Sequence, residues 1–86
     1  MRASITYQCK TSKGRPFSIT AELIETNAND YGNKHYIVIE EESGYEYNLD
    51  ARYDVRFNTV EKFYKNIIDV LRDRYDIATY KQIRKA

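Results

Sequence analysis

Residues 3–23 read ASITYQCKTSKGRPFSITAEL, and this stretch decides the fold because apolar and polar residues alternate on both sides of a turn. From Ile5 to Cys9 every second residue is apolar, which is the pattern of a half-buried strand. The Gly and Pro of residues 12–16 mark a turn, and the alternation resumes from Phe17 to Leu23. We therefore expect a strand at about residues 3–11 and a second strand that completes a β-hairpin.

The chain downstream of this hairpin carries signals for further strands. Residues 26–34, TNANDYGNK, have the Asn, Asp and Gly content of a loop. Residues 36–39, YIVI, are apolar throughout, as in a central strand covered on both faces. Apolar or small residues then occupy every odd position from Tyr45 to Phe57. That stretch exceeds the usual strand length, so we expect a bend at about residues 49–51.

A helix is predicted in the C-terminal third. Asn58 and Glu61 have the spacing of a capping box, and Thr59 is an alternative cap. Apolar residues then recur at steps of three and four from Val60 to Tyr75, with charged residues on the opposite face. The tail, residues 77–86, fits a short second helix or a strand, and its apolar spacing slightly favours a helix capped by Asp76.

Together these elements predict one α+β domain over residues 1–86. We expect an antiparallel sheet of four to five strands, a β-hairpin followed by a β-β meander, packed on one amphipathic helix. The chain has one cysteine and no apolar segment long enough for a signal peptide or a membrane span. A cytoplasmic protein without a membrane partner is therefore expected.

The residue types that catalysis or metal binding requires do not occur together in the sequence. His35 and Cys9 are the only histidine and cysteine, whereas a structural zinc site needs about four such ligands. No glycine motif for binding phosphates is present. The carboxylates of Glu40–Glu42 and Glu46 are a candidate Mg²⁺ cluster, but a solvated strand end and turn is the favoured interpretation. We predict a protein that is not an enzyme and has no catalytic residues, metal or cofactor.

Acidic and basic residues are strongly segregated along the chain, although the net charge is only +1. Residues 22–54 carry nine acidic and two basic residues, whereas the flanking segments have an excess of bases. Most of the nine tyrosines lie on apolar stripes and are expected to border the core. These are Tyr7, Tyr47, Tyr53, Tyr64 and Tyr75.

Tyr31 and Tyr45 differ from these because they lie among acidic residues. Tyrosine beside carboxylates suits contact with a basic protein surface, since the ring supplies contact area and the acids supply electrostatic steering. We therefore predict a partner-binding surface in the acidic segment. Its residues are Asp30, Tyr31, Glu40, Glu41, Glu42, Tyr45, Glu46, Asp50 and Asp54.

In its size, its strand-rich layout and its acidic loops joined to one amphipathic helix, the chain resembles the small anti-CRISPR proteins of phages and mobile genetic elements. The resemblance covers the general build of most of the chain but no diagnostic motif, and no site residue is taken from it. The basic ends and the net charge of +1 depart from the strongly acidic members. The resemblance implies a cytoplasmic inhibitor in a bacterial host cell that occupies the basic, nucleic-acid-binding groove of a CRISPR effector nuclease.

Two other functions are compatible with the sequence. In one, basic residues of the first hairpin and the tail meet on one face and bind nucleic acid phosphates weakly. The residues concerned are Lys10, Lys13, Arg15, Lys81, Arg84 and Lys85. In the other, the chain is a structural homodimer of a mobile element, formed through a strand edge or a helix face. Either a monomer or a homodimer is thus expected.

Overall fold

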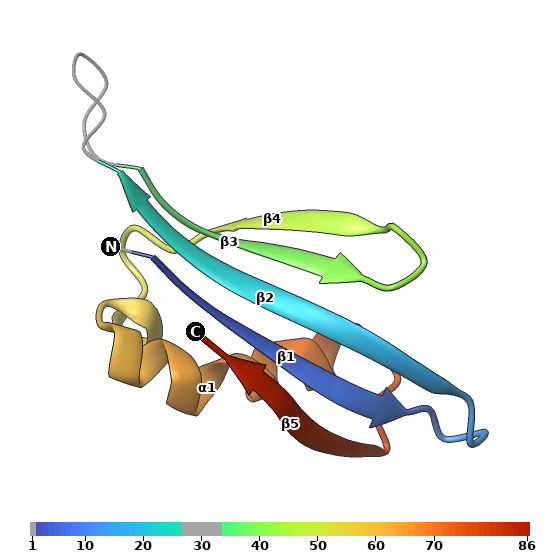
Figure 1. The fold of residues 1–86 in the computed structure, drawn as a ribbon. Coiled ribbons are helices and arrows are strands. Elements are labelled where there is room, and N and C mark those ends of the chain that lie inside the picture. Colours follow the sequence, from blue (N-terminus) through green and yellow to red (C-terminus); the bar gives the residue numbers. More distant parts are fainter. Residues whose placement is uncertain (1, 27–33) are drawn as a thin grey trace.

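The computed structural model describes residues 2–26 and 34–86, which form a five-stranded antiparallel sheet covered on one face by one helix (Figure 1). The strand order is β4-β3-β2-β1-β5. The strands are β1 (Arg2–Lys10), β2 (Pro16–Thr26), β3 (Lys34–Glu41), β4 (Glu46–Asp50) and β5 (Thr79–Lys85), and the helix is α1 (Val60–Arg74). The predicted α+β class, with an antiparallel sheet and one amphipathic C-terminal helix, is confirmed.

The first hairpin forms as its alternating pattern predicts. Strands β1 and β2 pair from Arg2 opposite Ile24 to Lys10 opposite Pro16. Gly14 lies in the connecting turn with a φ of 81°, a left-handed conformation that glycine adopts without strain. The alternating apolar residues of both strands, from Ala3 to Cys9 and from Phe17 to Leu23, are buried on the face that carries α1, so the hairpin supplies the floor of the core.

Helix α1 contributes the other half of the core. Phe63, Ile67 and Leu71 are fully buried against β1 and β2, and each such side chain is worth roughly 1.5–3 kcal/mol before entropy is counted. The helix begins at the alternative cap: the Thr59 hydroxyl accepts a hydrogen bond from the Lys62 N–H at 3.1 Å. Asn58 does not cap it, because its backbone ends the preceding 3-10 turn in a helical conformation.

The prediction that residues 36–39 are covered on both faces is wrong. Ile37 and Ile39 are buried on the helix side, whereas Tyr36 and Val38 are half-buried on the opposite face. Tyr36 lies opposite Ile24 in the sheet register. No helix among the described residues covers this second face, and neighbouring side chains shield the apolar groups only in part.

The predicted long strand from Tyr45 to Phe57 is also wrong in its second half. Strand β4 ends at Asp50, within the expected bend, and a turn and a 3-10 helix, Val55–Phe57, follow. The carboxylate of Asp50 accepts the N–H of Arg52 at 3.0 Å, a local bond that competes with strand pairing. Its place in the alternation predicted that Tyr53 would border the core. This prediction is wrong, because Tyr53 is 93% exposed.

The tail forms a strand, so the slight preference for a second helix is wrong. Strand β5 pairs with β1 from Lys10 opposite Thr79 to Ile5 opposite Lys85 and thereby satisfies backbone groups along the second edge of β1. Asp76 does not cap a helix. Its carboxylate accepts hydrogen bonds from the N–H and the hydroxyl of Ser12, the latter at 2.7 Å, and ties the β1–β2 turn to the start of β5.

Within residues 2–26 and 34–86, no helix combines the length and the apolar character needed to cross a bilayer.

Candidate functional site

The hairpin of β3 and β4 carries the most exposed part of the predicted acidic surface. Glu40 on β3 lies directly opposite Glu46 on β4, and both side chains are exposed. They lie on the face that α1 does not cover, because the residues that alternate with Glu40 on β3 are the buried ones. Among the described residues neither carboxylate has an ion pair. Two like charges in this position destabilise a sheet.

The turn of this hairpin adds a third carboxylate and a tyrosine ring. Gly44, with a φ of 95°, closes the turn, and the Glu41 N–H donates to the Tyr45 carbonyl at 2.8 Å. The Glu42 carboxylate accepts the N–H of Ser18 at 2.9 Å and so fixes the turn to β2. The Tyr45 side chain is 57% exposed. Below, the acidic hairpin means the four residues Glu40, Glu42, Tyr45 and Glu46.

The other predicted partner-binding residues do not extend this surface. Glu41 is only 9% exposed and accepts hydrogen bonds from the N–H and the hydroxyl of Ser43. Asp50 and Asp54 form ion pairs with arginines two positions further on, Arg52 at 3.0 Å and Arg56 at 2.7 Å. Hydrogen bonds from these arginines lower the pKa of both carboxyl groups. Asp30 and Tyr31 lie outside the described residues.

The basic residues of the alternative site come together only in part. Pairing of β5 with β1 places Lys81 opposite Gln8 and Arg84 opposite Thr6, and Lys10 lies on the same face by the period of the strand. Lys85 is on the helix side, with its ammonium 4.7 Å from the centre of the Tyr64 ring. The remaining two, Lys13 and Arg15, are exposed in the β1–β2 turn.

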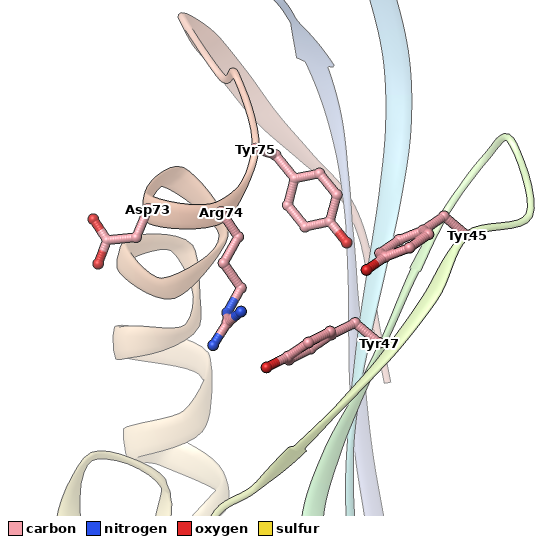
Figure 2. Close-up of a pocket in the computed structure, with 5 residues that line it drawn as sticks. All are labelled: Tyr45, Tyr47, Asp73, Arg74 and Tyr75. Carbon is pink, nitrogen blue, oxygen red and sulfur yellow. The ribbon is translucent and has the colours of Figure 1, made fainter.

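A hollow that the sequence did not predict lies between β4 and the C-terminal end of α1. It has a volume of about 390 Å³, and we call it the tyrosine hollow (Figure 2). Its lining residues are Tyr45, Tyr47, Asp73, Arg74 and Tyr75. It exists because α1 lies against β1 and β2, so that the helix side of β4 is left partly uncovered.

The arrangement of side chains in the tyrosine hollow is specific. The Arg74 guanidinium lies over the Tyr47 ring, 4.2 Å from its centre. Figure 2 shows the hydroxyl groups of Tyr45 and Tyr75 directed into the same space beside them. Burial raises the pKa of the Tyr75 phenol, and the neighbouring Tyr45 and Glu41 act in the same direction. This phenol is therefore protonated at neutral pH and available as a hydrogen-bond donor.

Sequence reasoning missed this hollow because the alternation of β4 and the helical spacing assigned Tyr47 and Tyr75 to the edge of the core. Both are in fact half-buried and border the hollow. The only sequence signal for the hollow was the pair of adjacent residues Arg74 and Tyr75 at the end of the predicted helix. Nothing in the sequence predicts that β4 lies beside this pair.

The groups most often used in catalysis have structural roles here. Cys9 is 1% exposed, and burial raises the pKa of its thiol. The His35 Nε2 group lies 2.8 Å from the Phe57 carbonyl, to which it donates, and Nδ1 is 3.9 Å from the Glu25 carboxylate. In the part of the chain that the structure describes, no three His, Cys, Asp or Glu side chains are grouped as metal ligands.

Comparisons with protein-family models, with curated proteins and with solved structures give no match for this chain.

Proposed function

We propose that this chain is a non-enzymatic protein-binding module whose acidic hairpin contacts a basic surface of a partner. The opposition of Glu40 and Glu46 carries this proposal. A directly opposed pair of like charges costs stability in the isolated sheet. Proteins accept such a local conflict most often where a surface has a function, and a partner's cations would remove the repulsion.

Tyr45 and Glu42 fit the same role. The Tyr45 ring, which is 57% exposed at the tip of the hairpin, offers contact area that the carboxylates lack. Aromatic rings flanked by charges are common at the centres of protein interfaces, where the charges increase the association rate. Glu42 is held against β2 by Ser18, so its charge is positioned before a partner arrives.

We propose further that this contact inhibits the partner by mimicry of nucleic acid. The carboxylates of the acidic hairpin would take the places of phosphates in the nucleic-acid groove of the partner, and the resemblance to anti-CRISPR proteins names a CRISPR effector nuclease as the first candidate. Such binding competes with nucleic acid and weakens as salt is added.

The test is a binding titration of the labelled protein against a purified CRISPR effector nuclease and against an unrelated basic protein. Double charge reversal at Glu40→Lys and Glu46→Lys keeps a like-charge pair in the sheet but inverts its sign. We expect this variant to weaken the complex at least about tenfold and to slow association. A matched control, Glu61→Lys with Asp69→Lys on the exposed face of α1, changes the net charge equally.

Loss of binding only in the hairpin variant supports the proposal. Binding that persists in the hairpin variant, or that is lost equally in the helix control, contradicts it. Competition by single-stranded and duplex DNA separates mimicry from contact at another basic surface of the partner.

A second candidate, weak nucleic-acid binding, has one observation in its favour. Lys10, Lys81 and Arg84 share the helix-free face along β1 and β5. Neutralising three duplex phosphates predicts a slope of about −2.7 in a plot of log affinity against log salt. A gel shift of the unmodified protein that disappears in the Lys81→Gln and Arg84→Gln variant would favour this function over the first.

A further inference from the structure

The arginine that lines the tyrosine hollow has no hydrogen-bond acceptor among the described residues. Arg74 has no hydrogen bond and no ion pair with any described residue, although it is stacked on the Tyr47 ring at 4.2 Å. Of the other arginines near α1, Arg56 is paired with Asp54, whereas Arg72, which also has no ion pair among the described residues, lies over Tyr80 outside the hollow. The stack fixes the direction of the Arg74 guanidinium and leaves its N–H groups unused.

The remaining polar groups around this guanidinium are mostly donors. The hydroxyls of Tyr45 and Tyr75 are directed into the hollow, and both can donate. Asp73 is the one carboxylate among the lining residues, and Figure 2 shows its side chain directed away from the tyrosines. Glu41, which lies near Tyr75, is only 9% exposed and accepts two hydrogen bonds from Ser43 through Oε2. The hollow thus offers donors to a ligand that supplies acceptors.

We propose that the tyrosine hollow is a binding site for an oxyanion, carboxylate or phosphate, carried on a planar aromatic group. The oxyanion accepts hydrogen bonds from Arg74, whose planar fork matches two oxygens, and from the hydroxyl groups of Tyr45 and Tyr75. The aromatic group lies against the exposed ring of Tyr45. The tyrosine hollow and the acidic hairpin share Tyr45, but Glu40 and Glu46 lie on the opposite face of the sheet, and Arg74 and Tyr75 belong to the hollow alone.

The size and shape of the hollow support an aromatic carrier. Its volume of about 390 Å³ exceeds what a bare oxyanion fills and lies within the range of small-molecule sites. Tyr45 is 57% exposed, so its ring is accessible to a ligand. Stacking of a planar group on this ring adds contact area that inorganic phosphate cannot provide.

The test is a titration with phenyl phosphate followed by the NMR signals of the arginine Nε–H groups. We expect saturable shifts confined to Arg74 and to the amides that flank Tyr45 and Tyr75, with inorganic phosphate binding several-fold more weakly. Arg74→Gln is expected to weaken phenyl phosphate binding at least about tenfold. The matched control is Arg72→Gln, two positions away on the same helix and outside the hollow, which is expected to leave the affinity unchanged.

Further variants divide the site into its parts. Tyr45→Phe keeps the ring and is expected to lose only the contribution of one hydroxyl group to the affinity for phenyl phosphate. Tyr45→Ala is expected to make phenyl phosphate bind no more tightly than inorganic phosphate. The exposure of Tyr45 makes both variants compatible with folding, and the unchanged amide spectrum of the remaining protein checks this.

Three results would overturn the proposal. The first is no saturation by phenyl phosphate at a dissociation constant of about 10 mM or tighter. The second is equal binding by the Arg74→Gln and Arg72→Gln variants. The third is tighter binding of a cation such as methylguanidinium than of phenyl phosphate, which would make the hollow an aromatic cage. A parallel titration with a phosphotyrosine peptide tests whether the aromatic oxyanion belongs to a protein or to a small molecule. A bound peptide should also shift the amide signals along β4.

Discussion

Carboxylates two residues before an arginine behave differently here from the other carboxylates of the acidic segment. In Asp50-Ala51-Arg52 and Asp54-Val55-Arg56 the aspartate accepts both the N–H and the side chain of the arginine. Glu40 and Glu46 have no arginine at that spacing, and they remain exposed and unpaired within the described chain. The repeated Asp-x-Arg spacing was therefore the signal that two of the predicted site residues would be neutralised.

The two Asp–Arg pairs predict a fall in stability in acid. Their hydrogen bonds lower the pKa of Asp50 and Asp54 from the ordinary value of 3.8, so the unfolded chain binds protons first as the pH falls. The stabilisation is present above about pH 5 and is lost as the pH falls through the folded-state pKa values. Urea unfolding between pH 6 and pH 2 checks this, in steps of about one pH unit. The double variant Asp50→Asn and Asp54→Asn should flatten the profile, and an unchanged profile would contradict the assignment.

The opposed pair Glu40 and Glu46 predicts a stabilising single substitution. Glu40→Lys replaces a like-charge pair by an opposite-charge pair, which is worth about 0.5 kcal/mol in the free energy of unfolding. The gain should shrink in high salt, because exposed charges are screened. Urea unfolding at low and high salt measures both effects. Equal stability of the variant and the parent at low salt would show that the two carboxylates do not repel each other.

At the scale of elements, the sequence correctly predicted the first hairpin and α1. In both, the period of the apolar residues matches the face that the element buries. The tail was misread because Ile77, Tyr80 and Ile83 recur at steps of three. Only Ile77 is buried; Tyr80 packs edge-on against Tyr7 at 5.7 Å, and Ile83 is 54% exposed near the register shift of β5. The free edge of β1 decides the conformation of the tail, and that edge becomes visible only when the sheet is assembled.

The alternation from Tyr45 to Phe57 misled for a related reason. The alternation of apolar and polar residues continues to Phe57. However, the carboxylates of Asp50 and Asp54 accept hydrogen bonds from nearby backbone N–H groups, and these bonds turn the chain before a longer strand can form. The candidate site likewise has a part that local sequence predicts and a part that it does not. Residues of the β3–β4 hairpin could be chosen from their charge, whereas the tyrosine hollow depends on where α1 crosses the sheet, which no local pattern records.

The start of α1 gives a prediction that separates the two caps considered from the sequence. Thr59→Ala removes the acceptor for the Lys62 N–H and should lower the free energy of unfolding by about 1 kcal/mol. Asn58→Ala, one residue earlier and also exposed, should change it by less than about 0.5 kcal/mol. Chemical denaturation of both variants makes the comparison. A larger loss at Asn58 than at Thr59 would restore the capping box that begins at Asn58.

For the whole molecule, stability rests on one core between the first hairpin and α1. A domain of 86 residues has a total stability of only about 4–13 kcal/mol, so a single buried methyl group is measurable. Ile67→Val in the fully buried face of α1 should cost about 1 kcal/mol. The same change at Ile83, which is 54% exposed, should cost less than about 0.5 kcal/mol. Similar losses at both positions would place β5 inside the cooperative core.

The position of that core also predicts an order of local opening. Strands β1 and β2 are paired on both sides and packed under α1, whereas β4 and β5 are edge strands, and every side chain of β5 is exposed. Amides of β1 and β2 should therefore exchange with solvent only through global unfolding, and those of β5 through cheaper local opening. The Ser12–Asp76 bonds restrain β5, so Asp76→Ala should speed exchange in β5 while leaving the slowest amides of β1 and β2 at the rate set by global stability. Hydrogen exchange followed by NMR measures each strand separately, and equal protection of β5 and β1 would mean that the tail strand unfolds only with the entire sheet.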